Sequence, residues 1–129
     1  MEPKDITVHY YKLLYSGELN GVKELMTEDS YIMTLESFGL RLSFENAHFK
    51  ALLKEIKESK ESFEKVEELL SKDLLKRDHK TKIEIVNAEM NGDMRQTVNY
   101  KEEDKVKKLY FSKEKDGWKI NYFAGRKVD

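Results

Sequence analysis

Residues 83–122 read IEIVNAEMNGDMRQTVNYKEEDKVKKLYFSKEKDGWKINY, and apolar side chains recur at every second position through much of this stretch. A period of two is typical of β-strands, because successive side chains of a strand point to opposite faces of the sheet. Two dipeptides, Asn91-Gly92 and Asp116-Gly117, are typical of two-residue hairpin turns, in which positive φ angles favour asparagine, aspartate and glycine. The pattern therefore predicts four antiparallel strands connected as a meander.

The alternation also assigns side chains to the two faces of the predicted sheet. The apolar positions are Ile83, Ile85 and Met90 on the first strand, Met94, Val98 and Tyr100 on the second, Leu109 and Phe111 on the third, and Trp118, Ile120 and Tyr122 on the last. The third strand carries Val106 and Tyr110 on its opposite face. Because this strand is apolar on both sides, we expect both faces of the sheet to be covered.

Before the meander, the apolar residues follow a helical period. Residues 3–16 begin with a proline, which is favoured in the first turn of a helix, and their apolar residues lie three and four positions apart. Gly17 is expected to end this helix in a left-handed conformation. Asn20 is expected to cap a short second helix, which the polar residues 27–30 then stop.

Residues 31–44 carry two conflicting patterns. Tyr31, Met33 and Leu35 alternate, and a second alternating set with the opposite phase begins at Phe38. The change of phase next to a glycine favours one bent strand or two short strands. A helix over residues 30–37 is the alternative.

Residues 46–77 form the most helical part of the chain. Phe49, Leu52, Leu53 and Ile56 follow the spacing of an amphipathic helix that Asn46 opens. Residues 57–62 lack large apolar side chains and predict a break or an exposed stretch, after which the helical period resumes. Residues 1–129 are therefore predicted to be one α+β domain, in which N-terminal helices pack on a curved, mostly antiparallel sheet.

Composition narrows the classes of function. The 129 residues include 24 Lys and Arg and 25 Asp and Glu, and this balance argues against a nucleic-acid partner, since nucleic-acid-binding domains are usually basic. The chain has no cysteine, which excludes a disulfide, a thiol nucleophile and a cysteine-ligated metal. It also has no apolar run of about 20 residues for a membrane helix and no signal-peptide pattern at its start. We expect a cytoplasmic location and no membrane partner.

Two stretches resemble the nuclear-transport-factor-2-like superfamily, an α+β cone with a cystatin-like fold. They are YKLLYSGELNGVKELM at residues 11–26, similar to the opening pair of helices, and KDGWKINY at residues 115–122, similar to the closing strand. The resemblance implies a curved sheet that wraps around helices and leaves a central pocket. Its members include isomerases, dehydratases, epoxide hydrolases and polyketide cyclases, as well as binding and dimerisation modules. The helical region 46–77 is longer than this superfamily's usual third helix.

Few residues are placed for catalysis. The aspartates fall at helix ends, in turns, on solvated helix faces or at the terminus, and Glu84 points away from the apolar face of its strand. His9 and His48 have no acid or nucleophile beside them, and His79 lies in a charged run that is expected to be exposed. The three histidines also lack the spacing of a metal site. We therefore expect no catalytic residue, no metal and no cofactor, and we predict a non-catalytic small-ligand-binding or dimerisation module. The alternative is a cofactor-independent isomerase, dehydratase or hydrolase that uses Tyr15 or His48 on a small hydrophobic molecule.

The expected pocket lies between the first helix, the third helix and the inner face of the meander. Its predicted lining, suited to a small apolar ligand, is Tyr11, Tyr15, His48, Phe49, Leu53, Tyr100 and Trp118. A shift of one residue would exchange the two faces of a strand, and the lining would then include Thr97, Asn99 and Asn121. The other face of the sheet is predicted to form a homodimer.

Overall fold

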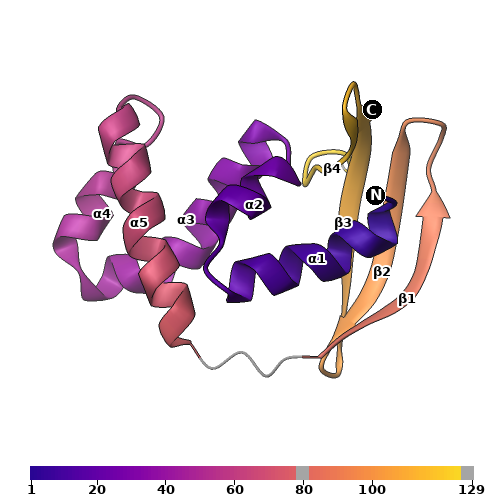
Figure 1. Cartoon of the computed structure of the whole chain (residues 1–129), viewed down its shortest axis with the longest axis horizontal. Coiled ribbons are helices and arrows are strands. Elements are labelled where there is room, and N and C mark those ends of the chain that lie inside the picture. Colours follow the sequence, from indigo (N-terminus) through magenta and orange to yellow (C-terminus); the bar gives the residue numbers. More distant parts are fainter. Residues whose placement is uncertain (78–81, 126–129) are drawn as a thin grey trace.

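The computed structural model describes residues 1–77 and 82–125, and over these residues the chain is an α+β protein with its helices before its sheet (Figure 1). The helices are α1 (Pro3–Tyr15), α2 (Leu19–Glu24), α3 (Glu28–Glu45), α4 (Ala47–Lys54) and α5 (Lys60–Lys76). The strands are β1 (Ile83–Met90), β2 (Arg95–Glu102), β3 (Lys105–Glu114) and β4 (Gly117–Ile120). The predicted fold class, helices followed by an antiparallel sheet, is confirmed at this level.

The four strands form an antiparallel meander in the order β1-β2-β3-β4, as the sequence predicts. The first predicted turn is wrong in its length, because four residues, 91–94, connect β1 to β2. The Asn91 side chain accepts a hydrogen bond from Thr97 at 2.8 Å, and its backbone N–H donates to the carbonyl of Arg95. These two bonds close the hairpin at Asn91, and only Gly92 takes a positive φ, of 120°.

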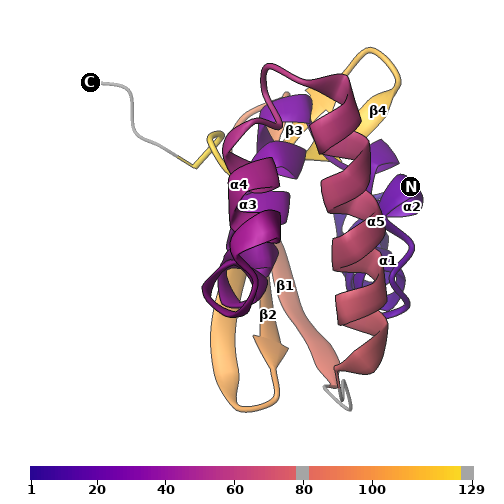
Figure 2. The ribbon, with the colours of Figure 1, turned by 90° about the vertical axis from the view of Figure 1, so that its left-hand side faces the viewer.

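Helix α1 lies across the inner face of the sheet (Figures 1 and 2). Helices α3, α4 and α5 pack against one another farther from the strands. The inner face carries the buried side chains Val98, Tyr100, Leu109, Phe111 and Ile120. On the opposite face of β3, Val106 is 66% exposed. The predicted alternation of Leu109 and Phe111 with Val106 is therefore confirmed. Burial of the apolar face against α1 stabilises the contact between the sheet and the helices.

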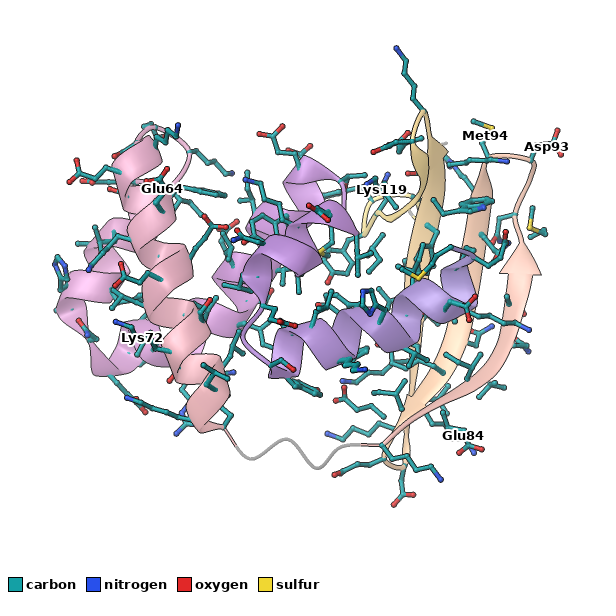
Figure 3. The ribbon with its side chains drawn as sticks, viewed as in Figure 1. Glu64, Lys72, Glu84, Asp93, Met94 and Lys119 are labelled. Carbon is teal, nitrogen blue, oxygen red and sulfur yellow. The ribbon has the colours of Figure 1, made fainter. Side chains whose placement is uncertain are left out.

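The two edges of the sheet differ. At the β4 edge, the backbone N–H of Ile120 donates to the carbonyl of Leu25 at 2.8 Å, and the N–H of Thr27 donates to the carbonyl of Ile120 at 3.0 Å. Lys119 adds a bond from its side chain to the carbonyl of Glu24 (Figure 3). The chain between α2 and α3 thus covers this edge. The β1 edge has an irregular register between Ile85 and Asn87, and such bulges discourage pairing with other strands.

The bent strand predicted for residues 31–44 is wrong, because these residues belong to the 18-residue helix α3. Tyr31 and Leu35 are buried one helical turn apart, whereas Leu40 and Phe44 are 56% and 81% exposed. Leu40 and Phe44 created the apparent alternation without contributing to a buried face. Gly39 lies inside the helix, and glycine suits this position because any Cβ there would come within 3.0 Å of the Phe49 ring.

The predicted helix boundaries are confirmed at three places and wrong at one. Asn46 caps α4 by accepting a hydrogen bond from the N–H of Phe49, as expected of an opening asparagine. The predicted break lies between α4 and α5, and Ser59 caps α5. Asn20 does not cap α2, since the helix begins at Leu19 and Glu18 occupies the N-cap position. Gly17 takes a φ of 70°, the predicted left-handed conformation.

Candidate functional site

Tyrosines from α1, β2 and the segment after β4 form a hydrogen-bonded network between α1 and the sheet. The hydroxyls of Tyr11 and Tyr100 share a hydrogen bond, and their ring centroids lie 5.5 Å apart. The hydroxyl of Tyr10 lies 3.2 Å from that of Tyr122, which also shares a bond with Thr34 of α3. This network, which we call the tyrosine network, links the first helix, the sheet and the helical layer.

A carboxylate adjoins the tyrosine network. The Tyr15 hydroxyl donates to one oxygen of Glu102 at 3.1 Å, and the Lys107 ammonium donates to the other at 2.9 Å. The side chain of Glu102 is 19% exposed. Glu102 is the last residue of β2, and the sequence analysis did not identify it as a site residue. The overlooked signal is its spacing, since Glu102 shares the face of Val98 and Tyr100 two positions along the strand.

The environment of the tyrosines keeps their phenols protonated. Burial is the main cause that raises the pKa of Tyr10 and of Tyr11, and it raises the pKa of Tyr100 to about 12. A phenol that stays neutral at physiological pH donates and accepts hydrogen bonds but does not act as a base. Because these hydroxyls already bond to one another, the tyrosine network supports the fold more directly than it supports proton transfer.

Apart from Trp118, the residues predicted to line one pocket are distributed over three places. Tyr11 contacts both Tyr15 and Tyr100, so these three lie together under the sheet. Phe49 and Leu53 face Gly39 of α3 within the helical layer. His48 is exposed and borders a groove between α4 and α5. That these residues bind a ligand stays a prediction.

The remaining candidates of the sequence interpretation also have defined positions. Trp118 is half-buried, and the ammonium of Lys113 lies 5.8 Å from its ring. Thr97, Asn99 and Asn121, the polar alternative lining, bond to neighbouring polar side chains. Glu84 is exposed on β1, as expected (Figure 3). His9 is half-buried on α1, whereas His79 lies outside the described residues.

Among the grooves of the described residues, one combines an apolar floor with a lysine rim. It has a volume of about 530 Å³ and lies between the end of α2, the start of α3 and the α4–α5 connection. We call it the Lys23 groove, and its lining is Met26, Tyr31, Ile32, Ile56 and Phe63 on the floor with Lys23, Glu28, Lys57, Glu58 and Lys60 on the rim. Met26, Tyr31 and Ile56 are buried core residues, so the floor is part of the folded core.

The Lys23 side chain lies over the aromatic part of this floor. Its ammonium is 5.1 Å from the ring centroid of Phe63 and 5.9 Å from that of Tyr31. Cation–π contacts of this kind contribute about 0.5–1 kcal/mol at exposed sites. The Tyr31 hydroxyl donates a hydrogen bond to the carboxylate of Glu67 on α5, and this bond holds the Tyr31 ring in place. Burial raises the pKa of Tyr31 far above its ordinary value.

A second groove lies beyond the Tyr31–Glu67 bond and has the opposite charge. This acidic groove, of about 570 Å³, separates the α1–α2 turn from α5, and Glu18, Glu64, Glu67 and Glu68 border it. Figure 3 shows Glu64 on the first half of α5. Helix α5 therefore borders a basic rim at its start and an acidic surface farther along.

The described residues offer no metal site and no membrane-spanning helix. Within residues 1–77 and 82–125, no group of three or more histidine and acidic side chains is placed to hold a metal ion. In the same part of the chain, no helix combines the length and the apolar character needed to cross a bilayer. Known protein families, curated proteins and solved structures contain no match to this chain.

Proposed function

We propose that this protein is a non-catalytic small-molecule-binding module and that the Lys23 groove is its ligand site. The observation that carries the proposal is the apolar floor of Met26, Tyr31 and Ile56 within a groove of about 530 Å³. Ligand sites are typically concave, mostly apolar and about 300–1,000 Å³ in volume, with a few polar groups at their border. A floor built from core residues is also largely preformed, which lowers the entropy cost of binding.

The tyrosine network supports a binding role over a catalytic one. A general base needs a titratable group whose pKa lies near the working pH and which can reach a substrate. Burial instead holds Tyr11 and Tyr100 in their neutral forms, and their hydroxyls bond to each other. The alternative, an isomerase, dehydratase or hydrolase that uses Tyr15 or His48, would need these residues to act together. Tyr15 bonds Glu102 beside the sheet, whereas His48 borders the α4–α5 groove.

For the fold, we propose a cone of the nuclear-transport-factor-2-like type. Two features support this assignment: the antiparallel meander, and a first helix that lies across one face of it. In this arrangement the tyrosine network occupies the interior of the cone. The ligand site then lies outside the cone, where the extended helical region of residues 46–77 packs on α3.

Filling the Lys23 groove is expected to abolish ligand binding. Ile32 is a half-buried floor residue, and Ile32→Trp places a large ring in the groove. A ligand found by thermal-shift screening of small amphipathic and apolar molecules should stabilise the wild type by about 2.7 kcal/mol at a hundredfold excess over its dissociation constant. The same ligand should leave the melting temperature of Ile32→Trp unchanged.

Leu52→Trp is the matched control, since Leu52 is half-buried and borders the separate α4–α5 groove. This variant should bind the ligand as the wild type does. A screen without any stabilising molecule, or a ligand that Leu52→Trp blocks and Ile32→Trp does not, would contradict the assignment.

Self-association through the sheet is a second candidate function. The meander carries exposed apolar side chains, among which Val106 of β3 is 66% exposed on the face away from α1. Burying such a side chain against a second copy of the sheet would be favourable. Sedimentation equilibrium should therefore give twice the chain mass of 15.3 kDa, and Val106→Lys should shift the equilibrium towards monomer. A wild type that sediments as a monomer at high micromolar concentration would rule out the dimer.

A further inference from the structure

We propose that the Lys23 groove selects an amphipathic anion, in which a carboxylate is joined to an apolar chain or ring. This inference rests on the proposed function, because it assigns a chemical class to the ligand of that same groove. It follows from three features of the groove: the unpaired lysines of the rim, the position of Lys23 over the floor, and the acidic surface that adjoins it.

The rim has more positive than negative charge, and its lysines are available to a ligand. Lys23, Lys57 and Lys60 are exposed, and none of them forms an ion pair with any residue in the described part of the chain. Farther along α5, by contrast, Lys65 and Lys72 both pair with Glu68. The two rim carboxylates, Glu28 and Glu58, leave an excess of one positive charge. An anionic head group would therefore gain charge-assisted hydrogen bonds without breaking an existing ion pair.

The position of Lys23 couples the charge to the apolar floor. Its ammonium lies over the rings of Tyr31 and Phe63, whose centroids are 6.1 Å apart. A carboxylate bound to this ammonium would hold the rest of its molecule directly above the apolar floor. An inorganic anion would gain only the contact with the lysines, and a neutral apolar molecule would gain only the floor. A molecule that has both parts makes both contacts at once.

The acidic groove beyond Tyr31 strengthens the selection. The carboxylates of Glu18, Glu64, Glu67 and Glu68 repel an anion from that groove, so the Lys23 groove is the favoured anion site along α5. Because the charges of both grooves are largely exposed, this preference should weaken as the ionic strength rises. A cationic amphiphile is expected to show the opposite preference.

The test compares three probes that have the same ten-carbon chain, decanoate, decanol and decylamine, each kept below the concentration at which it forms micelles. Isothermal titration calorimetry at low salt should give a dissociation constant for decanoate about tenfold lower than that for decanol, the size of effect that one charge-assisted contact supplies. Decylamine should not bind at the Lys23 groove. Lys23→Gln should raise the dissociation constant of decanoate about tenfold and leave that of decanol unchanged.

Lys72→Gln is the matched control, because Lys72 lies on α5 outside the groove (Figure 3) and its removal lowers the net charge equally. It should leave decanoate binding unchanged. Lys57→Gln and Lys60→Gln provide independent tests, and each should weaken decanoate binding even if Lys23→Gln does not fold. Equal affinities of decanoate and decanol, or equal effects of Lys23→Gln and Lys72→Gln, would overturn the anion selection and leave the proposed binding site intact. Failure of all three probes and of the wider ligand screen would overturn both.

Discussion

Above about pH 10, the free energy of unfolding should fall steeply, by about 1.4 kcal/mol per pH unit for each tyrosine that stays protonated only in the folded protein. Burial raises the pKa of Tyr10, Tyr11, Tyr31 and Tyr100 above that of an exposed tyrosine. In the unfolded chain these phenols lose their protons near pH 10, while the folded protein still holds them. The unfolded state then binds fewer protons, so stability falls with rising pH.

The direction of the shifts also fixes the pH range of this effect. Below about pH 9 each phenol is protonated in both states, and the tyrosines contribute no pH dependence. For Tyr100 the loss continues up to its folded pKa of about 12. Urea unfolding curves measured between about pH 8 and pH 11 test the prediction. Ultraviolet absorbance of tyrosinate in the same samples should show that these tyrosines ionise together with unfolding.

Replacing two members of the tyrosine network provides the control. In the variant Tyr11→Phe, Tyr100→Phe, both hydroxyls of one hydrogen bond are absent, and no buried hydroxyl of this pair remains unbonded. Its stability should therefore fall less steeply above about pH 10 than that of the wild type. A stability profile that stays flat from neutral to strongly alkaline pH would show that these tyrosines are accessible to solvent.

The sheet could be predicted from the sequence because its local signals agree with its packing. Along β2 and β3, the buried residues Val98, Tyr100, Leu109 and Phe111 share the face that α1 covers, so the period of two reports a real buried face. The geometry of the first hairpin could not be predicted in the same way. It depends on the bond between the side chains of Asn91 and Thr97, which lie six residues apart.

Within residues 31–44 the sequence favours a bent strand over the helical alternative at residues 30–37, because exposed apolar residues give a misleading period, and α3 contains this alternative helix. Leu40 and Phe44 contribute to alternation in the sequence but lie on the solvent side of the helix. The glycine at position 39 also suggested a bend, whereas its true role is to admit the ring of Phe49 from α4. The need for glycine at position 39 comes from a tertiary contact between α3 and α4, and the spacing of apolar residues along the sequence carries no information about such a contact.

The candidate site was predictable only in part. Tyr11 and Tyr100 were both recognised as inner-face residues, and the structure brings their hydroxyls together. The Lys23 groove combines side chains from α2, α3 and α5, and Lys23 and Phe63 are distant in sequence. No local pattern joins residues that far apart. The groove follows from how α5 packs beside α2 and α3, which the sequence interpretation left open.

The packing of α4 can be tested at Phe49, where Phe49→Ala should lower the free energy of unfolding by about 3–5 kcal/mol. The side chain is fully buried, and its ring lies directly against Gly39 of α3. Removing it leaves a cavity at the α3–α4 contact, and the eight-residue helix α4 is too short to be stable without that contact. Because small domains are stable by only about 5–15 kcal/mol, urea unfolding should show a much lower midpoint for this variant.

Phe44→Ala is the matched control, since it removes the same side chain from a position of α3 that is 81% exposed. Its stability should stay within about 0.5 kcal/mol of the wild type. Similar losses in the two variants would contradict the orientation of α3, because that result requires Phe44 to be buried. A large loss confined to Phe49→Ala would instead establish the α3–α4 contact. Ile56 of the Lys23 groove floor follows α4 directly, so this contact also bears on the ligand site.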